Sequence, residues 1–459
     1  MTTQIVMAST AFGLATATAA YDSGAFQPCE RRILVVACNT AMPEATTPIQ
    51  DLAGVPDLMR RFDAVYDYNA CIEPQHPSSW HPRLGDLPLW ERHFRQLWKL
   101  GSSDLHLVVE SIHVNPAQAL CRIFGDARID VYADGLMSYG PTRTPLPEMV
   151  SSRIERLLHL DLVPGLRPLL LSEQQVPTTM ITTECFRAVA KTMVGERYAL
   201  DDSNRIALII GQYLAANGFL SNQEELDLYA AMVAGCADAG YSLIAFKPHP
   251  STPDNLRIAL QAVADACGVQ LLVPDRDEIA EAWFERGGVG LVVGCFSTAL
   301  MTASRLYGLP VARLGTDLML ERLSPLQNSN RIPVTIVDAL VPELGSLAGS
   351  KTDLSQVINI NALVVAVGYT MQPLRLADRR SEAVAFLADH YQSHARYFKR
   401  RRLTQLGLPG GLPPTQSRLK RTLRRRVRRL IGRARTTLGR WLLRLPRVEG
   451  SASSPKIDS

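Results

Sequence analysis

Side chains that can do group-transfer chemistry stand directly after short apolar runs in this sequence. Four such groups are present: Ser9-Thr10, Asp134-Gly135, Lys247-Pro248-His249-Pro250 and Ser297-Thr298. Hydroxyls and free N–H groups at a helix start bind phosphate. A carboxylate can take a proton from an attacking hydroxyl, and a histidine can hydrogen-bond or protonate a departing phosphate. Together the groups predict transfer from a nucleotide-activated donor to an alcohol.

Each group also has a purely structural interpretation. The hydroxyl pairs are typical helix N-caps. Asp134-Gly135 is typical of a turn, and His249 between two prolines is typical of a rigid corner. Lys247 can stabilise charge on a phosphate or simply face solvent. The functional interpretation rests on all four groups following predicted strands. Gln212 and Gly294, which also follow or end such runs, are further candidates for the same cleft.

Ten runs rich in Val, Ile and Leu alternate with helix-sized segments. The first five are Ile5–Ala8, Ile33–Ala37, Ala64–Tyr66, Leu105–Val109 and Ile129–Tyr132. The second five are Ile206–Ile210, Leu243–Phe246, Gln270–Val273, Val289–Val293 and Pro310–Leu314. Continuous apolar strands separated by helices indicate parallel sheets covered on both faces. The pattern predicts an α/β fold with two doubly wound domains facing a cleft, and ligands bind at the carboxyl ends of such strands.

Residues 175–205 interrupt this rhythm, so we predict an N-terminal domain over 1–190 and a C-terminal domain over 191–395. A basic linker and helical tail are predicted over 396–459. Residues 72–89 predict a long loop, and two further His-Pro pairs, at His76 and His81, are interpreted as loop residues because neither follows a predicted strand.

The charge of the 459-residue chain is strongly asymmetric. Between Arg396 and Arg447 there are 18 Arg or Lys residues and no Asp or Glu. Residues 448–459 carry a net charge of −1, so the overall charge of +5 leaves a net charge of −12 on residues 1–395. The eight cysteines show no metal-binding spacing, and no metal site is predicted. No apolar run is long enough to span a membrane.

The motifs resemble those of bacterial sialyltransferases. Tyr132-Ala133-Asp134-Gly135 resembles the acidic-acidic-Gly motif, Lys247-Pro248-His249-Pro250 the His-Pro motif, and Ser297-Thr298 the Ser-Ser/Thr motif. Their order, together with the Ser9–Leu14 opening, looks most like the bacterial alpha-2,8-polysialyltransferase group. The first acidic position of the motif is Ala133 here, which departs from the family pattern.

The resemblance implies a GT-B-like fold of two Rossmann-like domains, with inverting, metal-independent transfer from CMP-sialic acid and no cofactor. Asp134 would be the base that deprotonates a hydroxyl of a glycan or glycolipid acceptor. His249 would assist the departing CMP phosphate. Ser297 and Thr298, with Gly294, Lys247 and Pro250, would lie on the donor side, and Ser9, Thr10, Gly135 and Gln212 on the acceptor side or in the cleft.

The C-terminal tail predicts a membrane contact. Apolar residues that include Leu423, Val427 and Trp441 recur at steps of three and four over residues 415–446, and arginines such as Arg424 and Arg428 fill the other face. A cationic face beside a Leu/Trp face is typical of a helix lying in an anionic membrane surface. Docking onto an acidic protein surface is the alternative, and the apolar stripe disfavours nucleic acid.

We therefore expect a cytoplasmic glycosyltransferase held peripherally at the inner face of the cell membrane. Two alternatives remain open. One is a glycosyl- or polyol-phosphate transferase of cell-surface polymer synthesis that uses another nucleotide donor. The other is a non-catalytic scaffold in capsule assembly.

Overall fold

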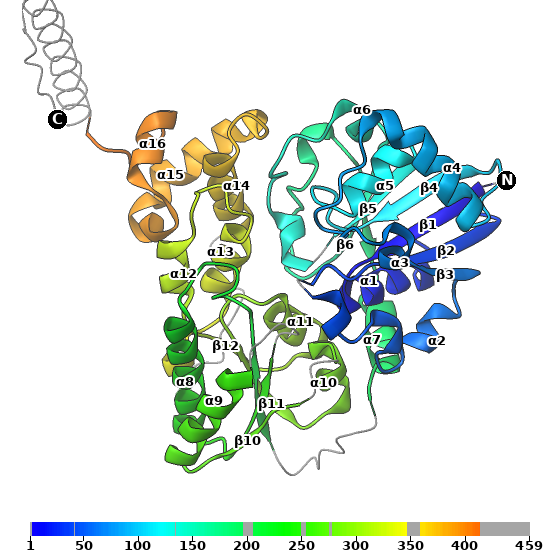
Figure 1. The fold of residues 1–459 in the computed structure, drawn as a ribbon. Coiled ribbons are helices and arrows are strands. Elements are labelled where there is room, and N and C mark those ends of the chain that lie inside the picture. The colour runs from blue at the N-terminus through cyan, green and yellow to red at the C-terminus, as the bar shows by residue number, and fades with distance from the viewer. Residues whose placement is uncertain are drawn as a thin grey trace, which may run out of the picture. The chain divides into compact units, whose positions relative to one another are not determined.

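The computed structural model describes residues 2–40, 42–133, 135–195, 205–248, 254–274, 278–346 and 359–413. It contains two parallel β-sheets covered by helices, so the predicted α/β class and the two doubly wound sheets are confirmed (Figure 1). The chain divides into two compact units, with the boundary in the sequence between His390 and Tyr391. Both sheets belong to the first unit. The predicted domain limits over 1–190, 191–395 and 396–459 stay predictions.

The first sheet has the strand order β3-β2-β1-β4-β5-β6-β7, with every neighbouring pair parallel. Its strands are β1 (Thr2–Ala8), β2 (Arg31–Val36), β3 (Ala64–Asp67), β4 (Asp104–Val109), β5 (Arg128–Tyr132), β6 (Ile154–Leu160) and β7 (Thr178–Ile181). The first five of these were predicted. The last two were not, and β7 and the helix after it occupy the segment that was interpreted as a break.

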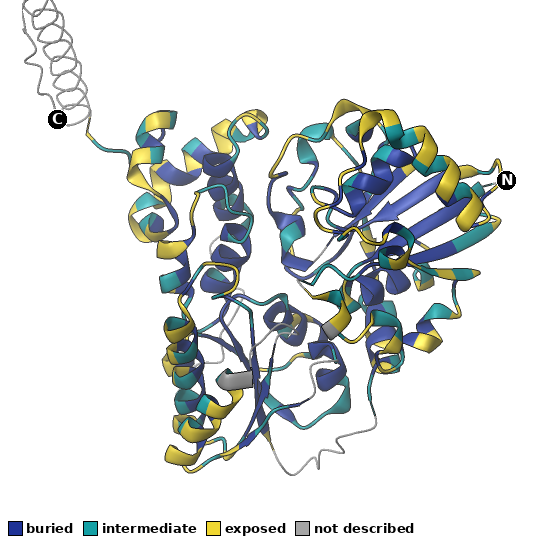
Figure 2. Ribbon diagram, in the orientation of Figure 1, coloured by how far each residue is buried: buried dark blue, intermediate teal, exposed yellow. Residues whose placement is uncertain are grey.

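Helices cover both faces of the first sheet. They are α1 (Ala11–Asp22), α2 (Val55–Met59), α3 (Tyr68–Ile72), α4 (Leu87–Leu97), α5 (Ala117–Ile123), α6 (Glu148–Ser151) and α7 (Thr183–Thr192). Figure 1 shows α4, α5 and α6 on one side of the sheet and α1, α2 and α7 on the other. The apolar runs of the strands form the core between these layers, as the dark blue strands of Figure 2 show.

The second sheet has the order β10-β9-β8-β11-β12, again with parallel pairs throughout. Its strands are β8 (Ile206–Ile210), β9 (Leu243–Lys247), β10 (Gln270–Leu272), β11 (Val289–Gly294) and β12 (Val311–Arg313), all of which were predicted. Every residue of β8 is buried, as expected for a central strand covered on both faces.

The helices of the second half begin with α8 (Asn222–Asp238), whose start is fixed by a capping box between Ser221 and Glu224. The others are α9 (Asp254–Ala266), α10 (Ala280–Arg286), α11 (Thr298–Tyr307), α12 (Thr316–Arg322), α13 (Arg331–Leu340), α14 (Ile360–Met371), α15 (Arg380–His394) and α16 (Arg400–Leu406). None of the helices in the described ranges combines the length and apolar character needed to cross a membrane. The amphipathic tail helix predicted over 415–446, with Leu423, Arg424, Val427, Arg428 and Trp441, lies outside the described residues.

Candidate active site

The two hydroxyls after β1 have different partners, a helix start for Thr10 and a buried carboxylate for Ser9. Thr10 is the N-cap of α1 and accepts a hydrogen bond from the Gly13 backbone N–H at 2.9 Å. The backbone N–H and the hydroxyl of Ser9 both donate to Glu110, which directly follows β4 and is 1% exposed. In the first sheet the chain adds β2 and β3 on one side of β1 and β4 to β7 on the other, so its direction of winding reverses between β1 and β4. The two hydrogen bonds from Ser9 to Glu110 span this reversal point. Ligands of doubly wound sheets bind at such points.

The second sheet is bridged at its own reversal point by Gln212. This residue follows β8, and its side-chain oxygen accepts a hydrogen bond at 2.9 Å from the backbone N–H of Phe296, which follows β11. The hydroxyl of Tyr229 holds the backbone of Gln212 by accepting from its N–H at 2.6 Å and donating to its carbonyl at 2.7 Å. Ser297 then caps α11 by accepting from the Ala299 N–H at 3.2 Å. In each sheet, therefore, a side-chain hydrogen bond links the two segments that follow the strands at the reversal point.

One cavity of about 570 Å³ is lined by residues from both reversal points. The sequence-predicted residues that line it are Ser9, Thr10, Gln212, Lys247, Ser297 and Thr298. Gly294 is buried at the end of β11 and is not among the lining residues. The structure thus brings together side chains that are separated by as many as 289 positions in the sequence.

The loop after β5 packs directly against the start of α11. Gly135 opens the short helix η4 (Gly135–Tyr139) with a φ of +61°, and a Cβ placed on it would lie 2.5 Å from the Thr298 hydroxyl oxygen. The Leu136 backbone N–H donates to that same oxygen at 3.3 Å. Gly135 therefore allows a close approach that a larger residue would prevent.

Three predicted site residues, Asp134, His249 and Pro250, lie outside the described residues. Their neighbours can be located. Gly135 contacts Thr298, and Lys247, two positions before His249, lines the cavity.

Sequence reasoning missed a carboxyl group in the cavity wall. Glu281, in the first turn of α10, is 2% exposed and accepts a hydrogen bond at 2.6 Å from the Thr302 hydroxyl. Burial raises the pKa of Glu281, against the opposing effects of the Thr302 hydrogen bond and the positive charge of Lys247. An acidic residue in a first helical turn is ordinarily explained by the helix dipole, so the sequence carried no signal of this role.

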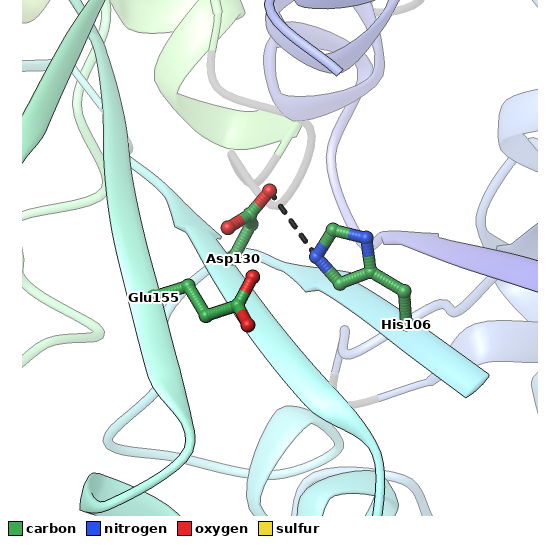
Figure 3. A group of neighbouring side chains, drawn as sticks. All are labelled: His106, Asp130 and Glu155. Carbon is green, nitrogen blue, oxygen red and sulfur yellow. Dashed lines mark ion pairs between the residues drawn. The ribbon is translucent and has the colours of Figure 1, made fainter. Parts of the chain in front are cut away.

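A separate polar group crosses the first sheet and includes a possible metal-ligand set, His106, Asp130 and Glu155 (Figure 3). His106 Nε2 lies 3.2 Å from the Asp130 carboxylate, and Arg156 donates to both oxygens of that carboxylate. Burial acts to raise the pKa of Asp130, but the interactions with His106 and Arg156 outweigh it and hold the pKa below its ordinary value. Because Arg156 already supplies the cation for Asp130, the group is best explained as a structural ion-pair network.

The arrangement of the cavity suits an anionic, activated donor. The Ser297 and Thr298 hydroxyls keep a hydrogen to donate even while their oxygens accept, and the N–H groups at the start of α11 lie beside them. Lys247 adds a positive charge to the same wall. The Ser9 and Thr10 hydroxyls line the cavity from the first sheet.

The sequence profile described as alpha-2,8-polysialyltransferase (POLYST) matches residues 4–316. The chain belongs to this family. It is accordingly a glycosyltransferase, and the resemblance seen in the sequence motifs is confirmed. The match spans both sheets, from β1 to the first residue of α12. No curated protein sequence matches the chain.

Solved structures align with this polysialyltransferase-family chain at low similarity. The GT-B domain of a Photobacterium damselae sialyltransferase aligns with 10% identity and a TM-score of 0.41, covering 75% of this chain and 99% of that one. A putative UDP-N-acetylglucosamine 2-epimerase from Listeria monocytogenes aligns with 12% identity and a TM-score of 0.42, covering 81% and 97%. MurG from Acinetobacter baumannii aligns with 11% identity and a TM-score of 0.38, covering 82% and 98%.

Proposed function

We propose that the 570 Å³ cavity binds CMP-sialic acid and that the enzyme transfers the sialic acid to a glycan or glycolipid hydroxyl with inversion and without a metal ion. The observation that carries this proposal is the convergence of Lys247, Ser297 and Thr298 with Ser9 and Thr10 on one cavity at both sheet reversal points. Membership of the family supports the choice of sialic acid.

The proposed step moves one proton and one glycosyl group. The acceptor oxygen attacks the anomeric carbon of the sialic acid while the bond from that carbon to the phosphate oxygen breaks, and the electron pair stays on CMP. Asp134 takes the acceptor proton, and His249 donates a hydrogen bond or proton to the departing phosphate. Lys247 and the hydroxyls of Ser297 and Thr298 stabilise the phosphate charge. Attack opposite the leaving group inverts the anomeric configuration.

A transfer assay with a series of activated sugars tests this proposal. The purified full-length chain is incubated with a fluorescent lactoside or sialyl-lactoside acceptor and with CMP-, UDP-, GDP- or CDP-activated donors, with and without EDTA. We expect product from CMP-sialic acid alone, an unchanged rate in EDTA, and an inverted anomer by nuclear magnetic resonance. Product from a UDP or CDP donor instead would assign the protein to another branch of polymer-forming transferases, and no product from any donor would favour a scaffold.

We further propose that residues 415–446 hold the enzyme on the inner face of the cell membrane. Two features of the sequence support this proposal. The tail has the pattern of an amphipathic helix, and it is strongly basic although residues 1–395 carry a net charge of −12. Attraction of about 1 kcal/mol per basic residue near an anionic surface is enough for stable attachment.

Vesicle sedimentation tests the membrane proposal. The full-length chain should bind phosphatidylglycerol vesicles and not phosphatidylcholine vesicles. Arg424→Glu combined with Arg428→Glu should weaken that binding at least tenfold. The matched double change Arg83→Glu combined with Arg92→Glu, at two exposed sites in the first half, should not. Equal binding by all three proteins would refute the assignment.

A further inference from the structure

Glu110 fixes the direction in which the Ser9 hydroxyl forms hydrogen bonds. One oxygen of the Glu110 carboxylate, Oε1, accepts from both the backbone N–H and the hydroxyl of Ser9. A backbone N–H can only donate, so this oxygen acts as an acceptor and the Ser9 hydroxyl points its hydrogen at it. Glu110 is 1% exposed, so its carboxylate depends on protein groups such as these for its hydrogen bonds. Ser9 therefore offers only the lone pairs of its oxygen to any further partner.

Thr10, the next residue, has the opposite polarity. Its Oγ1 accepts from the backbone N–H of Gly13 at 2.9 Å, which leaves the hydrogen of the Thr10 hydroxyl available to donate. Both Ser9 and Thr10 line the 570 Å³ cavity. Two consecutive residues thus present one hydrogen-bond acceptor and one donor to a ligand. Neighbouring hydroxyls of a sugar suit such a pair, because each hydroxyl can donate and accept.

Gly13 leaves the room that the Glu110 carboxylate occupies. A Cβ added to Gly13 would overlap Oε2 of Glu110 and would lie 2.9 Å from Oγ1 of Thr10. Gly weakens a helix relative to Ala, so helix stability does not explain this residue in the first turn of α1. The close approach of the buried carboxylate does explain it. Gly13, Glu110 and Ser9 therefore form one construction at the reversal point between β1 and β4.

This construction lies on the side of the cavity that the acceptor sugar must reach. The strand order places β4 between β1 and β5, and the segment after β5 carries the proposed base Asp134. The segments after these parallel neighbours leave the first sheet at the same edge. The attacking hydroxyl must meet the base, so its sugar binds along this edge. The groups proposed to hold the donor phosphate, Lys247, Ser297 and Thr298, end or follow strands of the second sheet.

We propose that Glu110 is a positioning residue that makes Ser9 the hydrogen-bond acceptor for a hydroxyl of the acceptor sugar other than the one that reacts. Glu110 acts through Ser9 and does not touch the sugar itself. The inference rests on the proposed function, because it takes the cavity to bring the activated donor and the acceptor together. A site built to accept from a substrate hydroxyl discriminates against analogues that lack the hydrogen of that hydroxyl.

Acceptor analogues with one altered hydroxyl test this inference. The full-length chain is given CMP-sialic acid and a fluorescent sialyl-lactoside acceptor. Each hydroxyl of its terminal sialic acid, except the reacting one, is replaced in turn by hydrogen or by fluorine. Fluorine is close to a hydroxyl in size but donates no hydrogen bond. At one position, wild-type protein should therefore use both analogues with about tenfold lower kcat/KM than the unmodified acceptor.

Variants then assign this preference to Ser9 and Glu110. Ser9→Ala removes the accepting oxygen and Glu110→Leu removes the group that orients it, so the tenfold preference should fall to about twofold or less in both. Glu110→Gln should keep the preference, because its amide oxygen can accept from the same two groups. Gly13→Ala displaces the carboxylate without removing it and should weaken the preference by about threefold or more. Asp130→Asn is the matched control, since it alters a buried carboxylate of the same sheet that does not line the cavity, and it should leave the preference unchanged.

The outcomes separate this inference from the proposed function. Wild-type protein that transfers no sialic acid to the unmodified acceptor would overturn the proposed function and the inference with it. Wild-type protein that transfers sialic acid but tolerates both analogues at every position, or rejects only the deoxy analogues, would overturn the role of Ser9 alone. A preference that persists in folded Glu110→Leu would overturn the role of Glu110. If Glu110→Leu does not fold, Gly13→Ala decides that role in the same way.

Discussion

Replacing Gly135 with Ala tests whether the loop after β5 must lie against the start of α11 for activity. The change has two separate effects. Ala is strained at a φ of +61°, and its Cβ would lie 2.5 Å from the Thr298 hydroxyl oxygen and 2.6 Å from its methyl carbon. Gly165 provides a matched control, because its φ is +78° and a Cβ there would meet nothing within 4 Å.

The two variants should differ in activity but not greatly in stability. Left-handed backbone conformation costs an Ala residue about 1–2 kcal/mol, and both variants incur this cost. In a domain of this size each kcal/mol lowers the melting temperature by about 2–4 °C. Only Gly135→Ala must also move Thr298 or η4, by about 1 Å, to restore normal contact distances. A displacement of that size at a reacting centre lowers the rate about 100-fold.

The assay measures kcat for transfer from CMP-sialic acid, together with the melting temperature of each protein. We expect Gly135→Ala to lose about 100-fold in kcat, and Gly165→Ala to stay within threefold of wild type. The reasoning would be refuted if Gly135→Ala kept more than half of the wild-type activity. It would equally be refuted if Gly165→Ala lost as much activity as Gly135→Ala.

Two further predictions follow from the buried hydrogen bonds. Gln212→Leu leaves the Phe296 N–H without its acceptor, so we expect a loss of about 1–3 kcal/mol in stability and at least tenfold lower kcat/KM. Unchanged transfer kinetics in a folded variant would contradict this. Asp130→Asn breaks a buried pair with Arg156 and should lower the free energy of unfolding at pH 7 by about 3 kcal/mol. Because the folded pKa of Asp130 lies below the unfolded value of about 3.9, this stabilisation is present above that pH and is lost as the pH falls through the folded pKa. Urea unfolding at pH 7 and near pH 3 should therefore show a difference between Asp130→Asn and wild type that shrinks in acid, and a constant difference would contradict the assignment.

The sequence predicted the strands that are central and apolar, because burial on both faces requires continuous runs of aliphatic residues. Ile206–Ile210 is such a run, and every one of its residues is buried. It did not predict β6, where Glu155, Arg156 and His159 interrupt the apolar run, or the edge strand β7, whose first three residues are only partly buried or exposed. Tertiary pairing, rather than local pattern, forms these two strands.

The candidate site was only partly predictable for a related reason. The hydroxyls of Ser9 and Ser297 stood out because they follow apolar runs. Glu110 carries the same signal, because it follows the predicted strand Leu105–Val109, but it was not selected, and its pairing with Ser9 depends on the strand order. Glu281 carries no such signal, because its role depends on helix packing that no local pattern specifies. Strand order places Glu110 beside Ser9, and helix packing turns Glu281 into the cavity wall.

Calorimetric titration with CMP and UMP tests the central claim most directly, because the claim is that the cavity recognises a cytidine monophosphate. Wild-type protein should bind CMP at least tenfold more tightly than UMP. Ser297→Ala should weaken CMP binding about tenfold while lowering stability by only about 1 kcal/mol through loss of the helix cap. The same change at exposed Ser102 should have no effect on either quantity. Equal affinity for CMP and UMP, or CMP binding that Ser297→Ala leaves intact, would contradict the account.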